Sequence, residues 1–192
     1  YTSDLAEHHA VRTAGGLFDI SHMAEFDVTG ADAGAFLDYA LAGRLSTMAV
    51  GKAKYSLVLA ESGGIVDDVI VYRLGEAHFL VISNAGNRDA VAAAFTERAA
   101  AFDVQVTDLT DDFSLIAVQG PIARTVLEQT TAIGAYERPL SELPYYAAAA
   151  AEFVAESATA AVPLLIARTG YTGEDGFEVL VPNSHACLLW DA

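Results

Sequence analysis

Basic residues are scarce in this 192-residue sequence: ten Lys and Arg stand against 26 Asp and Glu, which gives a formal net charge of −16. A protein that binds nucleic acid needs a basic stripe to neutralise phosphates, and the sequence contains none. The composition therefore excludes nucleic acid as a partner. It also leaves few cations for an anionic ligand, which would need local arginines.

Long apolar runs and cysteines are also lacking. No run reaches the roughly 18 residues that a membrane-spanning helix needs. The single cysteine, Cys187, cannot form an internal disulfide, which suits a reducing compartment. Because it lies in the apolar stretch Ala186–Trp190, we expect a buried helix residue, with a catalytic thiol as the alternative.

The two ends of the sequence lack the usual signals. Tyr1 is not a methionine, and the residues after it show neither the basic start nor the apolar region of a signal peptide. Residues 186–192 form a helical pattern that has no stop signal. We therefore expect these residues to be part of a longer polypeptide.

Hydrophobic residues make up 53% of the chain, a globular composition sufficient for one large or two small domains. Strand-like and helix-like segments alternate without a strict order, which predicts an α+β fold. Helices are expected at 31–41, 87–101 and from Gly120 through Thr130. Strands are expected at 25–29, 54–59, 65–73, 79–82, 104–109, 113–119, 162–168 and 177–181. The strands at 104–109 and 113–119 are expected to pair with each other, and 132–144 to be a loop.

Two adjacent carboxylates interrupt the apolar stretch from Gly63 to Arg73. Side chains alternate between the two faces of a strand, so Asp67 and Asp68 must point to opposite faces. A carboxylate buried without a partner costs several kcal/mol. We expect one of them, Asp67, to lie at a solvated edge or on a backbone amide. The other, in an apolar pocket that raises its pKa, would suit proton transfer or the binding of a protonated heterocycle.

A second functional candidate is the glycine-rich segment Arg168–Glu178. Its three glycines permit positive φ and close backbone approach. Tyr171 offers a stacking face, and the acidic residues offer acceptors for an aminopyrimidine edge. An ordinary glycine-rich hairpin is the alternative. The segment lacks the G-x-x-x-x-G-K-[ST] pattern of a phosphate-binding loop.

Other polar residues carry weaker signals. Ser21 and His22 lack a nucleophile elbow, and the five histidines lack the spacing of a metal site, so no metal is expected. Asn84 could contact a ligand, and Asn87 could cap the helix that follows.

Taken together, six segments resemble the glycine cleavage system T protein (aminomethyltransferase) family, and they occur in the family's order. They are Ala10–Arg12, Gly16–Met23, Gly63–Asp68, Asn84–Asn87, Gln119–Pro121 and Arg168–Glu178. The resemblance implies the folate-binding aminomethyltransferase fold, α+β with mixed or antiparallel sheets and packed helices. Residues 1–192 would form its N-terminal folate-binding region: two interleaved lobes, truncated at both ends and without the C-terminal lobe.

The resemblance also implies an activity and a location. A one-carbon unit would move from the aminomethyl-dihydrolipoyl arm of the H carrier protein to tetrahydrofolate, with release of ammonia. The enzyme would work in a bacterial cytoplasm or a mitochondrial matrix, without a membrane partner.

Site residues follow position by position from the resemblance. Asp68 matches the family's key catalytic acid, which also contacts folate. The remaining folate-site positions fall on Met23, Tyr55, Tyr72, Asn84, Tyr146, Tyr171 and Glu178. The arginine that binds the anionic folate tail is expected outside these 192 residues.

Several features depart from the family pattern or leave alternatives open. Ala24 stands where the family often has glycine, Ser83 precedes Asn84, and residues 147–161 replace a short strand with a longer alanine-rich passage. One alternative is the folate domain of a dimethylglycine or sarcosine dehydrogenase-like enzyme. Another is a non-enzymatic folate binder of the iron–sulfur assembly type, but that type has Lys-Gly-Cys-Tyr where this chain has Arg168-Thr-Gly-Tyr171.

Overall fold

The computed structural model describes residues 2–155 and 160–192 and has the α+β architecture expected from the sequence. The chain divides into two compact units. Unit 1 comprises Tyr1–Ser21 and Asp112–Ala192, and unit 2 comprises the intervening His22–Asp111. Among the described residues, no helix is long and apolar enough to cross a membrane.

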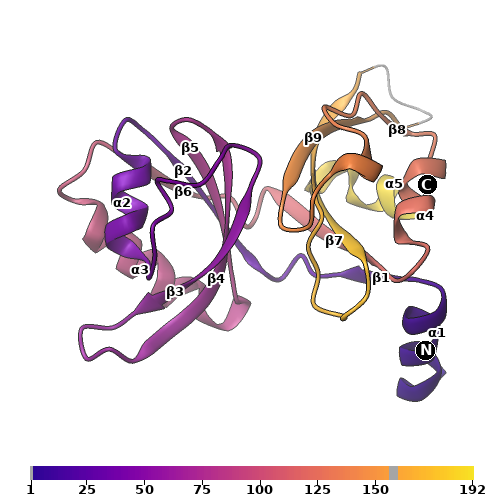
Figure 1. Cartoon of the computed structure of the whole chain (residues 1–192), viewed down its shortest axis with the longest axis horizontal. Coiled ribbons are helices and arrows are strands. Elements are labelled where there is room, and N and C mark those ends of the chain that lie inside the picture. The colour runs from indigo at the N-terminus through magenta and orange to yellow at the C-terminus, as the bar shows by residue number, and fades with distance from the viewer. Residues whose placement is uncertain (1, 156–159) are drawn as a thin grey trace. The chain divides into compact units, whose positions relative to one another are not determined.

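Unit 2 is a five-stranded antiparallel sheet covered on one face by two helices (Figure 1). Its strands, in the order β3-β4-β5-β2-β6, are β2 (Ala24–Thr29), β3 (Ala53–Leu59), β4 (Ile65–Gly75), β5 (His78–Ser83) and β6 (Gln105–Asp108). The helices are α2 (Ala33–Ala40) and α3 (Arg88–Ala99), the latter preceded by the short helix η1 (Ala85–Asn87). A turn containing Gly63, with φ of 83°, joins β3 to β4.

The helices are held to this sheet by apolar side chains that recur at helical and strand spacing. Phe36 of α2 and Phe26 of β2 each make an edge-to-face contact with Phe95 of α3. All three rings are fully buried in one cluster with the inward side chains of β4 and β5. Edge-to-face ring pairs add about 0.5–1.5 kcal/mol each beyond burial. Because this cluster packs one face of the sheet against α2 and α3, functional side chains of the sheet are expected on the opposite face.

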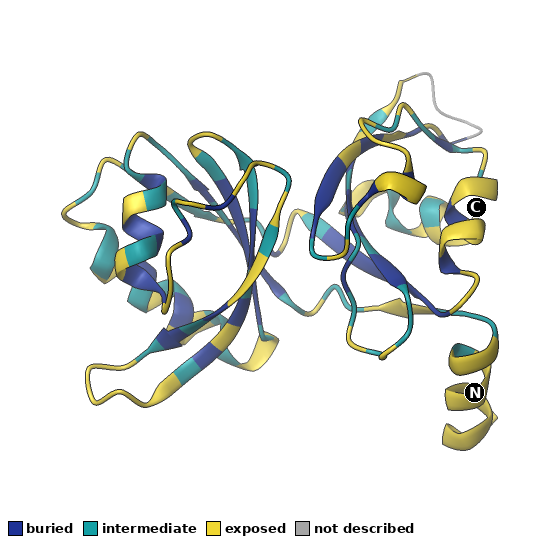
Figure 2. Ribbon diagram, viewed as in Figure 1, coloured by how far each residue is buried: buried dark blue, intermediate teal, exposed yellow. Residues whose placement is uncertain are grey.

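Unit 1 contains a six-stranded antiparallel sheet in the order β1-β7-β11-β10-β9-β8. The strands are β1 (Gly16–Asp19), β7 (Phe113–Gln119), β8 (Ile133–Gly134), β9 (Ala148–Phe153), β10 (Val162–Ala167) and β11 (Gly176–Pro182). The helices are α1 (Asp4–Thr13), α4 (Ala123–Gln129) and α5 (Ala186–Asp191), with short helices η2 (Leu140–Glu142) and η3 (Asn183–His185). Figure 2 shows α1 largely exposed and the strands of this sheet largely buried.

Most of the predicted helices and strands are confirmed to within a few residues, but three expectations are wrong. The strands predicted at 104–109 and 113–119 exist, yet β6 pairs with β2 and β7 pairs with β1 and β11. They do not form a hairpin because the chain passes from unit 2 to unit 1 between Asp111 and Asp112.

The second wrong expectation is the burial of Cys187, which is exposed on α5.

The third wrong expectation concerns the alanine-rich passage at 147–161, which does contain a short strand, β9. Its small side chains pair with β10 on one side and β8 on the other. Residues 156–159 of that passage lie outside the described residues. The expected loop at 132–144 includes β8 and η2.

Candidate functional site

The paired carboxylates lie on β4 and point to opposite faces of the unit 2 sheet, as alternation predicts. Asp67 is buried on the side covered by the helices, together with Val69 and Val71. Asp68 is exposed on the other side. The two residues therefore have different environments although they are neighbours in the chain.

Asp67 has a structural environment. Its carboxylate accepts hydrogen bonds from the backbone nitrogen of Asn84 at 2.9 Å and from the side-chain amides of Asn84 and Asn87 at 2.9 and 2.6 Å. The interpretation of Asp67 as a carboxylate bound to a backbone amide is confirmed. Asn87 precedes α3 but forms no side-chain capping bond to it, so its amide serves Asp67 instead.

Asp68 is held by two side chains, Tyr55 of β3 and Asn84, which directly follows β5. Its Oδ1 accepts a hydrogen bond from Asn84 Nδ2 at 2.9 Å, and its Oδ2 accepts one from the Tyr55 hydroxyl at 3.0 Å. The expectation of an apolar pocket around this carboxylate is wrong: Asp68 is exposed and its oxygens meet polar groups. Both oxygens can accept further hydrogen bonds from a ligand.

Strand register places every candidate residue of unit 2 on one side of the sheet. We call this side, opposite α2 and α3, the Asp68 face. Tyr55 lies opposite Ile70, Ile70 opposite Ile82, and Ile82 opposite Glu25. The candidates on or bordering the face are Met23, Tyr55, Asp68, Tyr72 and Asn84.

The candidates on the Asp68 face differ in exposure. Tyr72 is buried, whereas Tyr55 is 53% exposed, and Met23 is half-buried directly before β2. A half-exposed tyrosine ring whose hydroxyl is already bonded to Asp68 can still offer its face to a flat ligand. The face thus combines an aligned carboxylate with aromatic surface.

In unit 1 the structure brings Tyr146 and Glu178 together. The nitrogen of Tyr146 donates to the carbonyl oxygen of Arg168 at 3.0 Å, and Glu178 accepts from Thr169 Oγ1 at 2.5 Å. The pKa of the Tyr146 hydroxyl is raised by burial and by the nearby Tyr145 and Glu178. Tyr146 also has a φ of 55°, in the left-handed region. Strained backbone at a non-glycine residue is often found at functional sites.

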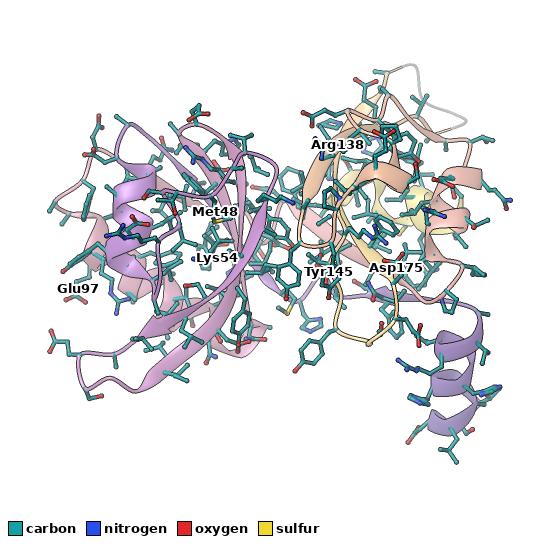
Figure 3. The ribbon with its side chains drawn as sticks, viewed as in Figure 1. Met48, Lys54, Glu97, Arg138, Tyr145 and Asp175 are labelled. Carbon is teal, nitrogen blue, oxygen red and sulfur yellow. The ribbon has the colours of Figure 1, made fainter. Side chains whose placement is uncertain are left out.

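The glycine-rich segment is an ordered loop between β10 and β11. Arg168 at its start donates two 2.9 Å hydrogen bonds to Asp175, which is labelled in Figure 3, and a third to the Leu143 carbonyl. The bonds to Asp175 and its negative charge raise the pKa of Arg168. From α1, Arg12 pairs with Glu174 at 2.9 Å and donates to the carbonyl oxygen of Thr172.

The buried side chain of Gln119 explains two of the loop's glycines. Its amide nitrogen donates to the carbonyl of Thr169 at 3.0 Å, and its oxygen accepts from Thr172 Oγ1 at 2.9 Å. A Cβ at Gly170 or Gly176 would lie only 2.1 to 2.6 Å from this amide group. These glycines are therefore required for close packing on Gln119.

Tyr171, at the tip of the same loop, is fully exposed. The loop below it is held by the bonds of Arg168, Gln119 and Arg12, so the ring is presented on a fixed support. An exposed ring on an ordered loop is available for stacking.

Ser21 and His22 show no nucleophile arrangement. The Ser21 hydroxyl donates to Asp19 Oδ1 at 2.6 Å and accepts from the Leu115 nitrogen at 3.1 Å. His22 is exposed. The serine thus has a structural role where β1 ends.

Sequence reasoning missed Glu25 of β2, which is fully buried on the Asp68 face. The segment Ala24–Val28 alternates small or apolar residues with acidic ones, a pattern typical of a strand with one solvated face. No signal in the sequence distinguished Glu25 from the partly exposed Asp27.

Comparison with known proteins gives consistent results. The model of the family described as GCVT N-terminal domain matches residues 2–192. Aminomethyltransferase of Corynebacterium jeikeium (strain K411) is 49% identical over 99% of this chain and 50% of its own length. Aminomethyltransferase of Streptomyces coelicolor is 48% identical over 100% of this chain and 49% of its own length. The chain spans about half the length of the curated relatives it matches.

Solved structures resemble the chain as well. The glycine cleavage system aminomethyltransferase T from Bartonella henselae superimposes with a TM-score of 0.82 at 38% identity, covering 97% of this chain and 47% of that one. The heterotetrameric sarcosine oxidase from Corynebacterium sp. U-96 superimposes with a TM-score of 0.64 at 20% identity, covering 95% and 85%. That second likeness is one of fold alone.

Proposed function

Because the chain belongs to the GCVT N-terminal domain family, we propose that it forms the N-terminal part of an aminomethyltransferase of the glycine cleavage system. The reaction would transfer a one-carbon unit from the aminomethyl-dihydrolipoyl arm of the H carrier protein to tetrahydrofolate and release ammonia. Tetrahydrofolate, as the acceptor substrate, supplies the nitrogens that receive the carbon.

The alignment of Asp68 is the observation that carries this proposal. Tyr55 and Asn84, from two different elements, each bond one of its oxygens, so this exposed carboxylate has a fixed direction. In such a reaction a protein nucleophile is unnecessary, and orientation and charge stabilisation matter most. Asp68 would accept hydrogen bonds from the reacting nitrogens, align them and stabilise positive charge as it develops.

The other candidates, in each unit taken by itself, offer groups that suit a heterocycle. Tyr55 on the Asp68 face and Tyr171 on its loop in unit 1 offer exposed aromatic surface for stacking, whereas Tyr72 is buried and is a candidate through the family resemblance alone. Glu178 and Tyr146 offer polar groups for a ring edge, and Met23 offers a polarizable apolar contact. Each unit thus carries both carboxylates and aromatic rings, which are groups that suit a reduced pterin.

The anionic tail of folate is poorly matched to this chain. With ten basic residues against 26 acidic ones, and with Arg12, Arg88 and Arg168 already paired to carboxylates, residues 1–192 offer little to bind it. We infer that the arginine for the tail comes from elsewhere in the full-length protein. Calorimetry on residues 1–192 should show weak tetrahydrofolate binding, and tight binding would contradict this inference.

A second candidate, the folate domain of a sarcosine oxidase-like enzyme, is favoured only by the similarity of fold at 20% identity. An assay of ammonia release from aminomethylated, lipoylated carrier protein separates the two. Release that depends on tetrahydrofolate supports the aminomethyltransferase. Its absence, with demethylation of a methylamine substrate by the same gene product, would support the second candidate.

A further inference from the structure

Asn84 is held at two of its own atoms by a single carboxylate. Asp67 Oδ2 accepts a hydrogen bond from the Asn84 backbone nitrogen at 2.9 Å, and Asp67 Oδ1 accepts one from Asn84 Nδ2 at 2.9 Å. The two bonds close a ring through the carboxylate, so the side chain of Asn84 is fixed relative to its own backbone. The terminal torsion of an asparagine is broad and roughly two-fold, which leaves the amide without a preferred direction of its own. Asp67 supplies that direction.

The amide fixed in this way is the one that bonds Asp68. Asn84 Nδ2 lies 2.9 Å from Asp68 Oδ1 and 3.1 Å from the carbonyl oxygen of Asp68. An amide oxygen at that position would meet only acceptors, so the chemistry of its neighbours determines which end of the amide is the nitrogen. The terminal torsion of Asp68 is also broad. The direction of the Asp68 carboxylate therefore depends on Asn84 at Oδ1 and on the Tyr55 hydroxyl at Oδ2.

A second amide keeps Asp67 itself in place. Asn87, the last residue of η1, donates from Nδ2 to Asp67 Oδ1 at 2.6 Å. Three donors thus converge on one carboxylate that is only 3% exposed. A carboxylate accepts at both oxygens and meets all three, whereas an asparagine would turn its own NH₂ group toward at least one donor. Because Asp67 is buried on the helix side of the sheet, it cannot itself touch a ligand on the Asp68 face.

We propose that Asp67 is a positioning residue for the one-carbon transfer, which fixes the direction of the Asp68 carboxylate from the buried side of the sheet through the side chain of Asn84. The inference rests on the proposed function, in which Asp68 aligns the reacting nitrogens. A displacement of about 1 Å in such a group can cost about 10²-fold in rate. Loss of the Asp67 carboxylate should therefore lower the turnover number and leave the affinity for folate, which Asp67 does not contact, unchanged.

Asp38→Asn is a matched control for Asp67→Asn in the full-length gene product. Asp38 of α2 is another carboxylate of unit 2 that accepts three hydrogen bonds. Its Oδ1 accepts from the backbone nitrogens of Leu45 and Ser46 at 2.5 and 2.9 Å, and its Oδ2 accepts from the Ser46 hydroxyl at 2.5 Å. None of these bonds involves a residue of the Asp68 face. Both substitutions replace a carboxylate by an amide with one acceptor oxygen, and they differ in their connection to Asp68.

The turnover number kcat of ammonia release and the KM for tetrahydrofolate are measured at a temperature where near-UV circular dichroism shows each variant to be folded. Asp67→Asn should lower kcat at least about tenfold and keep KM within about twofold of the wild type. Asp38→Asn should keep both within about twofold. Wild-type kcat in Asp67→Asn, equal losses in the two variants, or a raised KM with unchanged kcat would overturn the proposal.

Asn87→Ala removes only one of the three bonds to Asp67 and is the milder variant, which decides the matter should Asp67→Asn not fold. Its kcat should fall at least about threefold at unchanged KM, since Asp67 is then less firmly held. Wild-type kcat in a folded Asn87→Ala protein, with Asp67→Asn unfolded, would likewise overturn the proposal.

A double-variant cycle separates positioning from a general effect on the fold. The Asp68→Ala variant has no carboxylate to position, so adding Asp67→Asn to it should lower the residual turnover by less than about twofold. A further tenfold loss in the double variant would show that Asp67 acts on some other group, and the proposal would fail.

A measurement that does not depend on activity distinguishes this failure from failure of the proposed function. The order parameter of the Asn84 side-chain amide, from ¹⁵N relaxation, should be about 0.85 in the wild type and below about 0.6 in Asp67→Asn. If the wild type releases ammonia with tetrahydrofolate but the amide is equally rigid in both proteins, only the role of Asp67 is wrong. If the amide loosens as expected but the wild type releases no ammonia, the proposed function fails and the hold of Asp67 on Asn84 stands.

Discussion

Asn84 Nδ2 lies 2.9 Å from Asp68 Oδ1 and, at the same time, 2.9 Å from Asp67 Oδ1. One amide group thus links the buried carboxylate to the exposed one. Because Asp67 also binds the backbone nitrogen of Asn84, the position of Asp68 depends on a residue that faces the other side of the sheet.

Asp68→Asn should abolish most turnover and leave folate binding nearly intact. The variant keeps the size of the side chain but loses the charge that would stabilise a positive transition state, an effect worth about 10²–10³ in rate. Ammonia release and tetrahydrofolate affinity are measured on the same preparation. Near-normal turnover would remove Asp68 from the mechanism.

Asp67→Ala should destabilise the fold by about 2–4 kcal/mol. The substitution removes the acceptor of the Asn84 backbone nitrogen and of the Asn87 amide, and each unmet group costs about 1–3 kcal/mol. The Asn84 amide keeps its bonds to Asp68. Urea denaturation measures the loss. Asp67→Asn, which retains an acceptor oxygen, is the matched control and should cost less; equal losses would contradict the hydrogen-bond explanation.

Gly176→Ala should be strongly destabilising because the new methyl group would overlap the buried amide of Gln119. Overpacking of this kind costs about 1–3 kcal/mol. In the double variant with Gln119→Ala the overlap is removed, so the combined loss should be smaller than the sum of the two single losses. Gly134→Ala, where a methyl group would meet nothing within 4 Å, is the control, and denaturation midpoints supply the comparison.

Tyr171→Ala should leave the free energy of unfolding within about 0.5 kcal/mol of the wild type, because the ring is fully exposed. If the ring stacks on folate, the affinity should fall about 2- to 12-fold, as expected for an aromatic pair. Tyr171→Phe should restore it. Unchanged affinity in the alanine variant would show that the loop does not contact the ligand through this residue.

Glu25→Gln should change how stability varies with pH. Burial and neighbouring carboxylates raise the pKa of Glu25 from 4.5 to about 8. The folded state therefore holds this proton more tightly than the unfolded state, and stability falls as pH rises from about 4.5 to about 8. The glutamine variant lacks this loss and should be relatively more stable at pH 9 than at pH 5, by up to about 4 kcal/mol. Denaturation curves at both pH values give the free energies of unfolding of the variant and the wild type. A difference between the two proteins that is the same at pH 5 and pH 9 would contradict the prediction.

The sequence predicts those features that depend on local periodicity. Alternation along β4 separates Asp67 from Asp68, and helical spacing locates α2 and α3. Local periodicity does not identify which strands pair where the chain passes from one unit to the other. The short connection between β6 and β7 is typical of a hairpin, yet these two strands belong to different sheets.

Long-range bonds are equally hidden from local patterns. The contacts of Asn84 with Asp67 span 17 residues, and those of Gln119 with Thr169 span 50. The burial of Glu25 depends on groups far from it in the sequence, so the alternating pattern of β2 predicts the wrong environment. The family resemblance, by contrast, selects five residues of unit 2 that lie on or border a common sheet face, together with three residues of unit 1.

The connection between the two units has a consequence for folding kinetics. Unit 2 is inserted between β1 and β7, which are adjacent antiparallel strands although about a hundred residues separate them. Closing so long a loop from an unfolded chain is slow, whereas β3, β4 and β5 are joined by short turns. If unit 2 folds first, the folded unit replaces the long flexible loop between β1 and β7. The rate at which unit 2 forms would then set the rate at which the larger sheet of unit 1 assembles.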